Sequence, residues 1–465
     1  MSFPLSQAIA DHVVAAGFDR LPAAAASAAR RSLLDGLGVM LGASGLAGEA
    51  VPFADLAALS GGGPCTLLGR EGRVGVAEAA FANGALAHAL DFEDSFDIAP
   101  VHPNACLLPA ALAWSEAHGP ISGAAFLAAL AVGCDLVCRL GIALRCDPSA
   151  FGWYPPPILG GFGAAATCGK LAGLSAAQMT DAFSLLLCSS TCSAEIKYSP
   201  DSHIRAVRDA FPAQAAVRSV QLAALGVRGF DRPFEGKAGL FAMYARGDYA
   251  PEDILDGLGE RYWGEALSYK PWPSCRGTHP FIGAAITLAG QRDILPADIA
   301  QIELAGHPIL RMLSEPEASK QRPSTAIDAK FSLPFTVATA LIDRAVTLDS
   351  FSPASLQRAD VAELARRVRI TIDEAAPADA IVAGTTTITL QDGRAFSLDL
   401  RQAHGHPSAP MSDGELEAKF RMCAARAARP LGRAQADQVI AGIAALPSVP
   451  DAAEAIFAGM EYADA

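Results

Sequence analysis

Charged residues are scarce in this 465-residue chain, and basic residues are scarcer than acidic ones. Asp, Glu, Lys and Arg make up 18% of the residues, and 36 basic against 49 acidic side chains leave a net charge of −13. Nucleic acids and anionic membranes attract proteins through basic surfaces that displace counterions. We therefore expect neither as a partner, and any anionic ligand must be attracted by a local cluster of cations.

The chain also lacks the short motifs of several ligand sites. It contains no Cys-x-x-Cys, no His-Glu-x-x-His and no two His residues four apart, the patterns of many metal and redox sites. The glycines at 163 and 169 are one residue too far apart for a phosphate-binding loop. Among the 10 cysteines, Cys134/Cys138 and Cys188/Cys192 lie four apart in apolar runs, which indicates buried thiols on helices.

No secretory leader or membrane span is evident in the sequence. The first 21 residues lack a basic segment followed by an apolar one, and the apolar stretch 123–144 is interrupted by Asp135 and Arg139. These features predict a soluble, cytoplasmic protein.

The residues that are present predict a large, well-packed helical protein. Hydrophobic side chains make up 51% of the chain, and there are 42 Gly residues. From residue 4 to about 225, apolar residues recur at three- and four-residue steps, with Gly, Pro or Ser between the periods. Because the chain is too long for one ordinary core, we expect two or three units, one of them a helical bundle.

The periodicity changes after about residue 295. Apolar and polar side chains alternate in residues 301–306, 367–373 and 385–400, and the last stretch contains Asp392-Gly393, a strong hairpin signal. Helical segments lie between these strands. This part of the chain is therefore predicted to be a small α/β unit with a mainly antiparallel sheet.

Helical spacing returns after Ser412, which is a suitable N-cap. We therefore predict a mainly α fold in which both chain ends form one all-helical domain and the α/β unit is inserted as a lid. The predicted helical domain comprises residues 1–268 and 408–465, and the predicted lid comprises residues 269–407.

The stretch HALDFEDSFDIAPVHPNA, which begins at His88, concentrates four acids in an Ala-rich region. On a helix through residues 85–96, His88, Asp91 and Ser95 would share one face, while Glu93 would point away toward solvent. This geometry would give Asp91 a defined inward direction. A solvated helix end would explain the same residue types.

His102 ends this stretch and precedes Pro103, which suits the first turn of a new helix. The dipole of that helix would favour a neutral imidazole, which can act as a base, although capping or packing are equally open roles. A metal site is a further interpretation, but no matching donors elsewhere support it. It would use four ligands from this stretch: His88, Asp91, Asp94 and His102.

Residues 197–208 form the first of two concentrations of cations. Lys197, Arg205 and Arg208 lie here in an otherwise acidic protein, and Arg guanidinium groups suit two-point contacts with carboxylates. Salt bridges with neighbouring Asp residues are the alternative.

The second concentration is YKPWPSCRGTHP, where Lys270, Arg276 and His279 follow one another between prolines and aromatics. Rigid loops between domains often carry function. If Lys270 is buried near other cations, its pKa is expected to be lowered and it could exchange protons. If it is exposed, it is only a linker residue.

Taken together and in order, these stretches resemble the 2-methylcitrate dehydratase family, also called MmgE/PrpD. The match covers at least residues 80 to 340. The segments that carry it are NGALAHALDFED at 83–94, His102-Pro103, LGGFGAAATCGKLAGL at 159–174, the basic residues 197–208, KPWPSCRGTHP at 270–280 and DAKFSLPF at 328–335.

The resemblance implies a large helical domain, a smaller α/β lid and a homodimer, with the active site between the domains. It also implies chemistry without a redox cofactor on a small di- or tricarboxylate, at a carbon next to a carboxylate. We expect no cofactor and no bound metal. Known reactions of the family are dehydration of 2-methylcitrate, decarboxylation of cis-aconitate and epimerisation of iminodisuccinate. The family motifs place Asp91, Ser95, His102 and Lys270 in the site.

Several positions differ from the pattern of the dehydratases and decarboxylases. Tyr154 stands where many members have a His, Arg205 and Arg208 align with a Lys and a His, and Phe335 replaces a Tyr. Each difference removes or replaces a proton donor or acceptor. Always-charged arginines favour holding carboxylates over moving protons.

From these differences we predict an epimerase of the iminodisuccinate type, because epimerisation needs only proton removal from one face and return to the other. A dehydratase-like or decarboxylase-like lyase is the alternative, followed by a non-catalytic family relative. In this hypothesis Lys270 and His102, or Tyr154, transfer protons, and Asp91 orients a cationic neighbour. The expected substrate-binding residues are Ser95, Lys197, Arg205, Arg208, Arg276 and His279.

Overall fold

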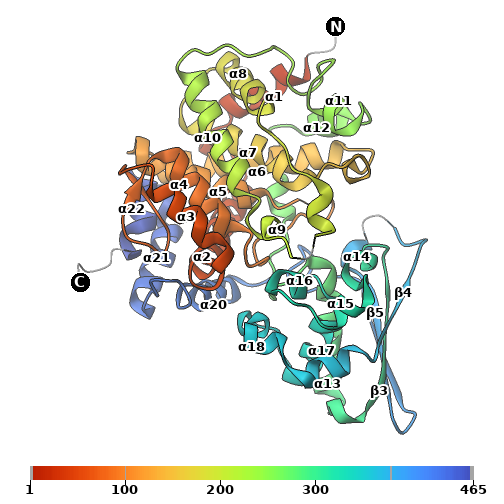
Figure 1. Ribbon diagram of the computed structural model, residues 1–465. Coiled ribbons are helices and arrows are strands. Elements are labelled where there is room, and N and C mark those ends of the chain that lie inside the picture. Colours follow the sequence, from red (N-terminus) through yellow and green to blue (C-terminus); the bar gives the residue numbers. More distant parts are fainter. Residues whose placement is uncertain (1–3, 100, 200, 378–379, 461–465) are drawn as a thin grey trace.

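A computed structural model describes residues 4–99, 101–199, 201–377 and 380–460, and Figure 1 shows their two-part arrangement. The larger part is helical and contains both the first and the last helices of the chain. Its first twelve helices are α1 (Leu5–Ala15), α2 (Ala23–Leu46), α3 (Val51–Ala58), α4 (Val76–Ala87), α5 (Pro103–His118), α6 (Gly123–Ala143), α7 (Pro155–Leu171), α8 (Ala176–Leu187), α9 (Ile204–Val207), α10 (Ala210–Ala224), α11 (Leu240–Ala245) and α12 (Pro251–Leu255).

The C-terminal helices return to this part of the molecule. They are α20 (Asp413–Ala424), α21 (Arg433–Ala445) and α22 (Ala452–Phe457). Helix α20 packs against α2, where a buried ion pair of 2.6 Å joins Lys419 Nζ to Asp35 Oδ1. Ser412 is the N-cap of α20, and its side chain accepts from the backbone N–H of Glu415, as predicted. In Figure 1 these blue helices lie beside the red and orange N-terminal ones.

The smaller part is an α/β unit at the lower right of Figure 1, with helices packed against a four-stranded sheet. Its elements are α13 (His279–Gln291), β3 (Ile299–Gly306), α14 (Leu310–Ser314), α15 (Glu317–Gln321), α16 (Ala326–Lys330), α17 (Leu333–Asp343), α18 (Pro353–Leu356), α19 (Ala359–Ala365), β4 (Val368–Ile372), β5 (Gly384–Leu390) and β6 (Ala395–Leu400).

The strand order is β4-β3-β5-β6. Strands β5 and β6 form the predicted hairpin around Gly393, whose φ of +87° explains the glycine. The pairs β3/β5 and β5/β6 are antiparallel, whereas β3 and β4 run parallel. The mainly α fold class with an inserted, mainly antiparallel unit is therefore confirmed, and one parallel pair is added to it.

The Gly-rich run in α7 has a packing role. A side chain at Gly163 would place its Cβ 2.3 Å from Val137 Cγ2 and 2.7 Å from the carbonyl oxygen of Gly133 on α6. Helices α6 and α7 therefore cross at a distance that only glycine permits. Helix α6 is long and apolar enough to cross a membrane, but 89% of its apolar window is buried inside the protein, as in the core of a globular domain.

Two local predictions for the helical part are wrong. A short antiparallel pair, β1 (Cys65–Thr66) and β2 (Arg73–Val74), interrupts the helices. Of the cysteines predicted to be buried, Cys188 is exposed and Cys192 is half-buried, because α8 ends at Leu187 before the apolar run does.

The two segments that connect the domains lie side by side. The N–H of Tyr269, on the way into the lid, donates to the carbonyl of Gly405, on the way out, at 3.0 Å. Gly405 has a φ of +88°, and a Cβ there would lie 1.9 Å from the Tyr269 carbonyl oxygen. This close contact brings Lys270 to the boundary between the domains.

Candidate active site

The acid-rich stretch after α4 is a loop rather than a helix. Helix α4 ends at Ala87 with His88 as its C-cap, and Asp91 has a φ of +48°, in the left-handed region. The predicted helix through residues 85–96 is therefore wrong, and Ser95 does not share a face with Asp91. Buried contacts with distant segments hold this loop, and local periodicity carries no information about such contacts.

Four side chains converge where this loop meets the start of α5. One potential ligand atom from each of His88, Asp91, Glu93 and His102 lies within 4.8 Å of the other three. Glu93 Oε1 contacts Nδ1 of His88 and lies 3.1 Å from Nδ1 of His102. Glu93 is only 1% exposed, so the prediction that it points to solvent is wrong. Because the chain leaves the helix at His88, Glu93 turns inward.

His102 is the N-cap of α5, and Pro103 occupies the first helical position, as predicted. Its Nδ1–H donates to the carbonyl oxygen of Asp94 at 2.8 Å, on the same side of the ring as Glu93. Both contacts use Nδ1 and fix the orientation of the ring. The Nε2 atom is thereby left for a ligand, and the side chain is 16% exposed.

Lys270 completes the cluster from the segment that enters the lid. Its Nζ lies 2.8 Å from Oδ1 and 3.0 Å from the backbone oxygen of Asp91, and the side chain is fully buried. Burial opposes the charge of Lys270, but Asp91 and Glu93 outweigh it and raise the pKa of the amine. The expectation of a lowered pKa is therefore wrong, because the nearest groups are carboxylates and not cations.

The same charges keep the carboxylates ionised. Burial alone would raise the pKa of Asp91, but the Lys270 ammonium and His88 hold it below its usual value. For Glu93, burial is again opposed, first by His88 and then by Lys270, and the pKa falls well below its usual range. The site thus presents a buried ammonium group, two carboxylates and an oriented imidazole.

One arginine and one lysine lie near the ring of Tyr154. The Tyr154 ring lies 5.1 Å from the guanidinium carbon of Arg208 and 5.4 Å from Lys197 Nζ. Arg208 is 2% exposed, and its Nη1–H donates to the backbone oxygen of Arg205 at 2.9 Å. The Arg205 guanidinium stacks 3.5 Å from the ring centre of Phe331 on the lid.

A cavity of about 820 Å³ lies between the two domains beside these cations. Lys197 and Arg205 contribute to its wall from the helical domain, and Arg311, Met312 and Phe331 contribute from the lid. Two of the predicted substrate-binding residues therefore line one cavity at the domain boundary. Its size suits a small organic acid with room for water.

Of the other four predicted substrate-binding residues, Arg208 lies beside Tyr154 and the remaining three belong to a neighbouring network. Arg276 Nε–H donates to Asp97 Oδ2 at 3.1 Å, and the Ser95 hydroxyl donates to Asp97 Oδ1 at 3.1 Å. Arg276 Nη1–H also donates to Nδ1 of His279 at 3.0 Å and to the carbonyl of His404 at 2.9 Å. These contacts join the acid-rich loop to both connecting segments. The structure brings Ser95, Arg276 and His279 together here, and not around Asp91.

His279 is held in the neutral form in that network. Burial, followed by the charges of Arg276 and Lys270, lowers its pKa well below the usual value. Its Nδ1 accepts from Arg276, and its Nε2–H donates to the carbonyl of Ser274 at 3.2 Å. Both ring nitrogens are therefore engaged with the protein.

Two buried lysines near Asp91 were missed by the sequence reasoning. Lys330 Nζ donates to the carbonyl of Leu90 at 2.7 Å, and Lys419 Nζ donates to that of Phe92 at 2.6 Å. Lys330 lies inside the motif DAKFSLPF, so a charged residue within an apolar segment was the available signal. Lys419 lies on α20 and gave no signal of this kind.

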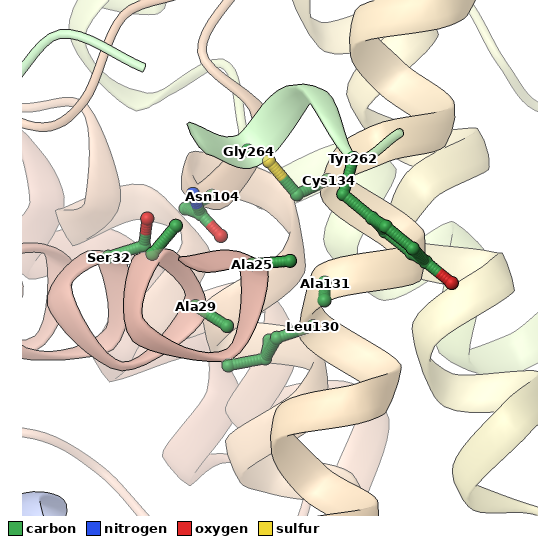
Figure 2. A pocket seen from close by; sticks show the side chains of 10 residues that line it. Ala25, Ala29, Ser32, Asn104, Leu130, Ala131, Cys134, Tyr262 and Gly264 are labelled. Atoms are coloured by element: carbon green, nitrogen blue, oxygen red, sulfur yellow. The ribbon is translucent and has the colours of Figure 1, made fainter. Parts of the chain in front are cut away.

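Figure 2 shows a different, smaller crevice inside the helical domain. Ala25, Ala29, Leu130 and Ala131 line it, with Ser32 and Asn104 among its few polar side chains. Its volume of about 10 Å³ leaves room for roughly one water molecule. It cannot hold an organic acid. The cavity between the domains is the candidate substrate site because Lys197 and Arg205 line it; Asp91, His102 and Lys270 are not among its lining residues.

The spacing of His88, Asp91, Glu93 and His102 would also suit a metal ion. Two of the carboxylate oxygens are already engaged, however, since Asp91 Oδ1 binds Lys270 and Glu93 Oε1 lies against both imidazoles. Asp91 Oδ2, Glu93 Oε2 and His88 Nε2 have no hydrogen-bond partner among the described residues, but a divalent cation at these atoms would be repelled by the nearby Lys270 ammonium. Asp94, a ligand in the metal interpretation, is not part of this group.

We therefore expect activity to survive treatment with a strong chelator such as EDTA followed by gel filtration. The measurement is the initial rate before and after treatment, with bound metal determined by mass spectrometry. A loss of activity that added Zn²⁺ or Mg²⁺ restores would contradict this prediction and would favour a metal site.

Comparisons with known proteins agree with this two-part architecture. The model of the MmgE/PrpD N-terminal domain matches residues 7–252, and that of the C-terminal domain matches residues 272–442. Three similar proteins are the cis-aconitate decarboxylases of Homo sapiens and Mus musculus and the cis-aconitate decarboxylase-like protein oryM of Aspergillus oryzae.

The human protein is 28% identical over 361 residues, which are 75% of this chain and 72% of that protein. The mouse protein is 28% identical over 388 residues, 80% of this chain and 76% of its own. The Aspergillus protein is 30% identical over 363 residues, which are 72% of this chain and 73% of that protein. With both domain models matched in order over most of its length, this chain belongs to the MmgE/PrpD family.

Proposed function

We propose that this protein is a lyase that acts without a redox cofactor on a small di- or tricarboxylic acid, at a carbon next to a carboxylate. The observation that carries the proposal is the buried Lys270 ammonium, paired with Asp91 and close to His102 at the boundary between the domains. The similarity to cis-aconitate decarboxylases favours a lyase over an epimerase. Cis-aconitate is therefore the first substrate to test.

The cations around the cavity supply the means to bind carboxylates. Nε of Arg205, and Nε and Nη2 of Arg208, are buried and lack a hydrogen-bond partner among the described residues. Buried guanidinium N–H groups without an acceptor are costly, and an anionic ligand would satisfy them. Lys197 and Arg205 lie at the cavity wall, whereas Arg208 is not among the lining residues and its Nε lies 3.6 Å from Asp209 Oδ2.

The charge state of Lys270 fits proton donation. In a decarboxylation, the bond between the substrate and its departing carboxylate breaks, and CO₂ leaves. The electron pair stays on the substrate carbon, where neighbouring cations stabilise the negative charge. A proton from the Lys270 ammonium or from His102 then forms the new C–H bond, and water returns the proton to the enzyme. In a dehydration, one of these groups would protonate the leaving hydroxyl while the other removes the proton from carbon.

An epimerase of the iminodisuccinate type is the second candidate. Tyr154, Arg205 and Arg208 replace proton-transferring residues of the decarboxylase pattern. Arg208 lies beside the Tyr154 ring and donates to the backbone oxygen of Arg205, which lines the cavity. Phe335, which replaces a Tyr, is 3% exposed and packs against Phe351 in the lid. One observation speaks against this candidate. Lys270 is held as an ammonium group, which is a poor base, so it could not remove a proton from one of the two faces of the substrate carbon.

An NMR experiment in deuterated water separates the candidates. The protein is incubated with a panel of cis-aconitate, 2-methylcitrate, citrate, tartrate and aspartate-like acids. The expected result is either a product that has lost CO₂ and carries one deuterium, or a product that has lost water and carries none, because only decarboxylation forms a new C–H bond. Exchange of the substrate α-hydrogen without loss of CO₂ or water would overturn the lyase proposal and favour the epimerase. No reaction with any acid would favour a non-catalytic relative.

Ligand binding provides a separate prediction. A tricarboxylate that occupies the cavity at 100 times its dissociation constant should stabilise the protein by about 2.7 kcal/mol, seen as a rise in melting temperature. An Arg205→Met variant should lose most of this rise because the acceptor-free guanidinium is gone, whereas Arg401→Met, an exposed lid arginine outside the cavity, should retain it. Equal rises in both variants would show that the acid binds elsewhere.

A further inference from the structure

Three buried lysines donate to three consecutive backbone oxygens of the acid-rich loop. Lys330 contacts the oxygen of Leu90 at 2.7 Å, Lys270 that of Asp91 at 3.0 Å, and Lys419 that of Phe92 at 2.6 Å. The lysines come from the lid, from the segment that enters the lid, and from C-terminal helix α20. Parts of the chain that are far apart in sequence thus hold the loop at the residue that pairs with Lys270.

Two of these lysines each form an ion pair with a carboxylate, and the third does not. Lys270 pairs with Asp91 and Lys419 with Asp35, but Lys330 has no carboxylate within 4.0 Å among the described residues. Lys330 is 3% exposed, and desolvation lowers its pKa to about 8. A buried charge without an ion-pair partner costs folding free energy. Stabilising the fold is therefore a poor explanation for Lys330.

The acid-rich loop needs contacts from other parts of the chain to keep its conformation. Asp91 adopts a left-handed φ of +48°, which is unfavourable for a non-glycine residue because its Cβ comes too close to the following carbonyl oxygen. The last carbonyls of α4 and those just after it have no helical partners. The Lys330 ammonium satisfies the carbonyl directly before Asp91.

Lys330 also reaches the segment that carries Lys270. Its backbone oxygen accepts from the N–H of Cys275 at 3.0 Å, five residues after Lys270. A single lid residue thus contacts the loop of Asp91 through its side chain and the loop of Lys270 through its backbone. Movement of the lid away from the helical domain would break the first contact.

We propose that Lys330 is a positioning residue: from the lid, it holds the Leu90 carbonyl so that Asp91 meets Lys270 in the geometry needed for catalysis. The expected effect of Lys330 on the catalytic rate rests on the proposed function, but the effect of Lys330 on the loop can be measured independently. Lys330 itself need not touch the substrate, since its effect would act through the Leu90 carbonyl to which its ammonium group donates.

The test compares Lys330→Met with Lys170→Met in the full chain. Lys170 is a matched control because its Nζ also donates to backbone carbonyls, those of Val13 and Val14, but far from the site. Hydrogen exchange followed by mass spectrometry is measured for peptides covering residues 88–97, where the Asp91 N–H donates to His88 and the Ser95 N–H donates to Ser268. Melting temperature, kcat and KM are measured in parallel.

Lys330→Met is expected to speed exchange in residues 88–97 without lowering the melting temperature, because a costly buried charge has been removed. A misplaced Asp91–Lys270 pair should lower kcat by about 10²-fold while KM stays near that of the parent. Lys170→Met should change neither the exchange of this loop nor kcat. If Lys330→Met is insoluble, Lys330→Gln replaces it with the same expectations.

Unchanged exchange in residues 88–97 would overturn the proposal, and so would faster exchange spread over the whole chain with a lower melting temperature, which indicates a general structural role. If the parent protein converts no acid in the panel, the proposed function fails. The exchange measurement then still decides whether Lys330 holds the loop.

Discussion

Replacing Lys270 by Met is expected to lower kcat by about 10³-fold, the largest loss of any single substitution considered for this protein. Its ammonium group is the buried cation of the site and lies 2.8 Å from Asp91 Oδ1. Met keeps the length of the side chain but can neither donate a proton nor offset the developing negative charge. The measurement is product formation in deuterated water, with the substrate identified from the acid panel.

Loss of activity through unfolding must be separated from loss of proton transfer. Removing Lys270 leaves Asp91 as an unpaired buried charge, a change that typically costs roughly 3–5 kcal/mol. The double variant Lys270→Met/Asp91→Asn removes both charges and should recover much of this stability while remaining inactive. If either variant transferred protons to or from the substrate as fast as the parent, the role assigned to Lys270 would be wrong.

The fold could be predicted because its signals are local. The hairpin around Gly393 follows from Asp392-Gly393 between alternating runs, and the start of α20 follows from Ser412. The parallel pairing of β3 and β4 could not be predicted in this way, because more than 60 residues and several short helices separate these strands. Strand order depends on packing between distant segments, which periodicity does not report.

The site was predictable only in part. Motif resemblance pointed to Asp91, His102 and Lys270, and the structure brings all three together. Helical periodicity placed Glu93 in solvent, yet Glu93 lies between two imidazoles. The error has a physical cause: the loop leaves helical geometry at His88, and the buried lysines that hold it lie some 180 to 330 residues further along the chain.

Arg276 and His279 show the limit of reasoning from residue type. Both occur in a Pro-rich loop beside Lys270, where a role in binding carboxylates was a fair expectation. In the structure the Arg276 guanidinium donates hydrogen bonds to Asp97, His279 and the carbonyl of His404. A guanidinium group whose N–H groups already donate inside the protein has few donors left for a ligand. The number of these internal partners cannot be derived from the sequence alone.

His102 and Tyr154 are the two residues proposed to transfer protons opposite Lys270, and a pair of substitutions should separate them. His102→Gln is expected to lower kcat by about 10²-fold or more, because the oriented imidazole is lost. The ring is held at Nδ1 by the Asp94 carbonyl and Glu93, which leaves Nε2 for the substrate. Tyr154→Phe should have a much smaller effect on kcat, since the ring that packs between Arg208 and Lys197 is retained.

Glu93→Gln tests the same assignment through the orientation of the ring. The variant keeps the size of the side chain but loses the negative charge beside both imidazoles, so kcat should fall by less than in His102→Gln while KM changes little. If Tyr154→Phe abolished activity while His102→Gln retained it, Tyr154 would be the proton-transfer group, and the contacts at Nδ1 of His102 would serve only to hold the loop that carries Glu93 and Asp94.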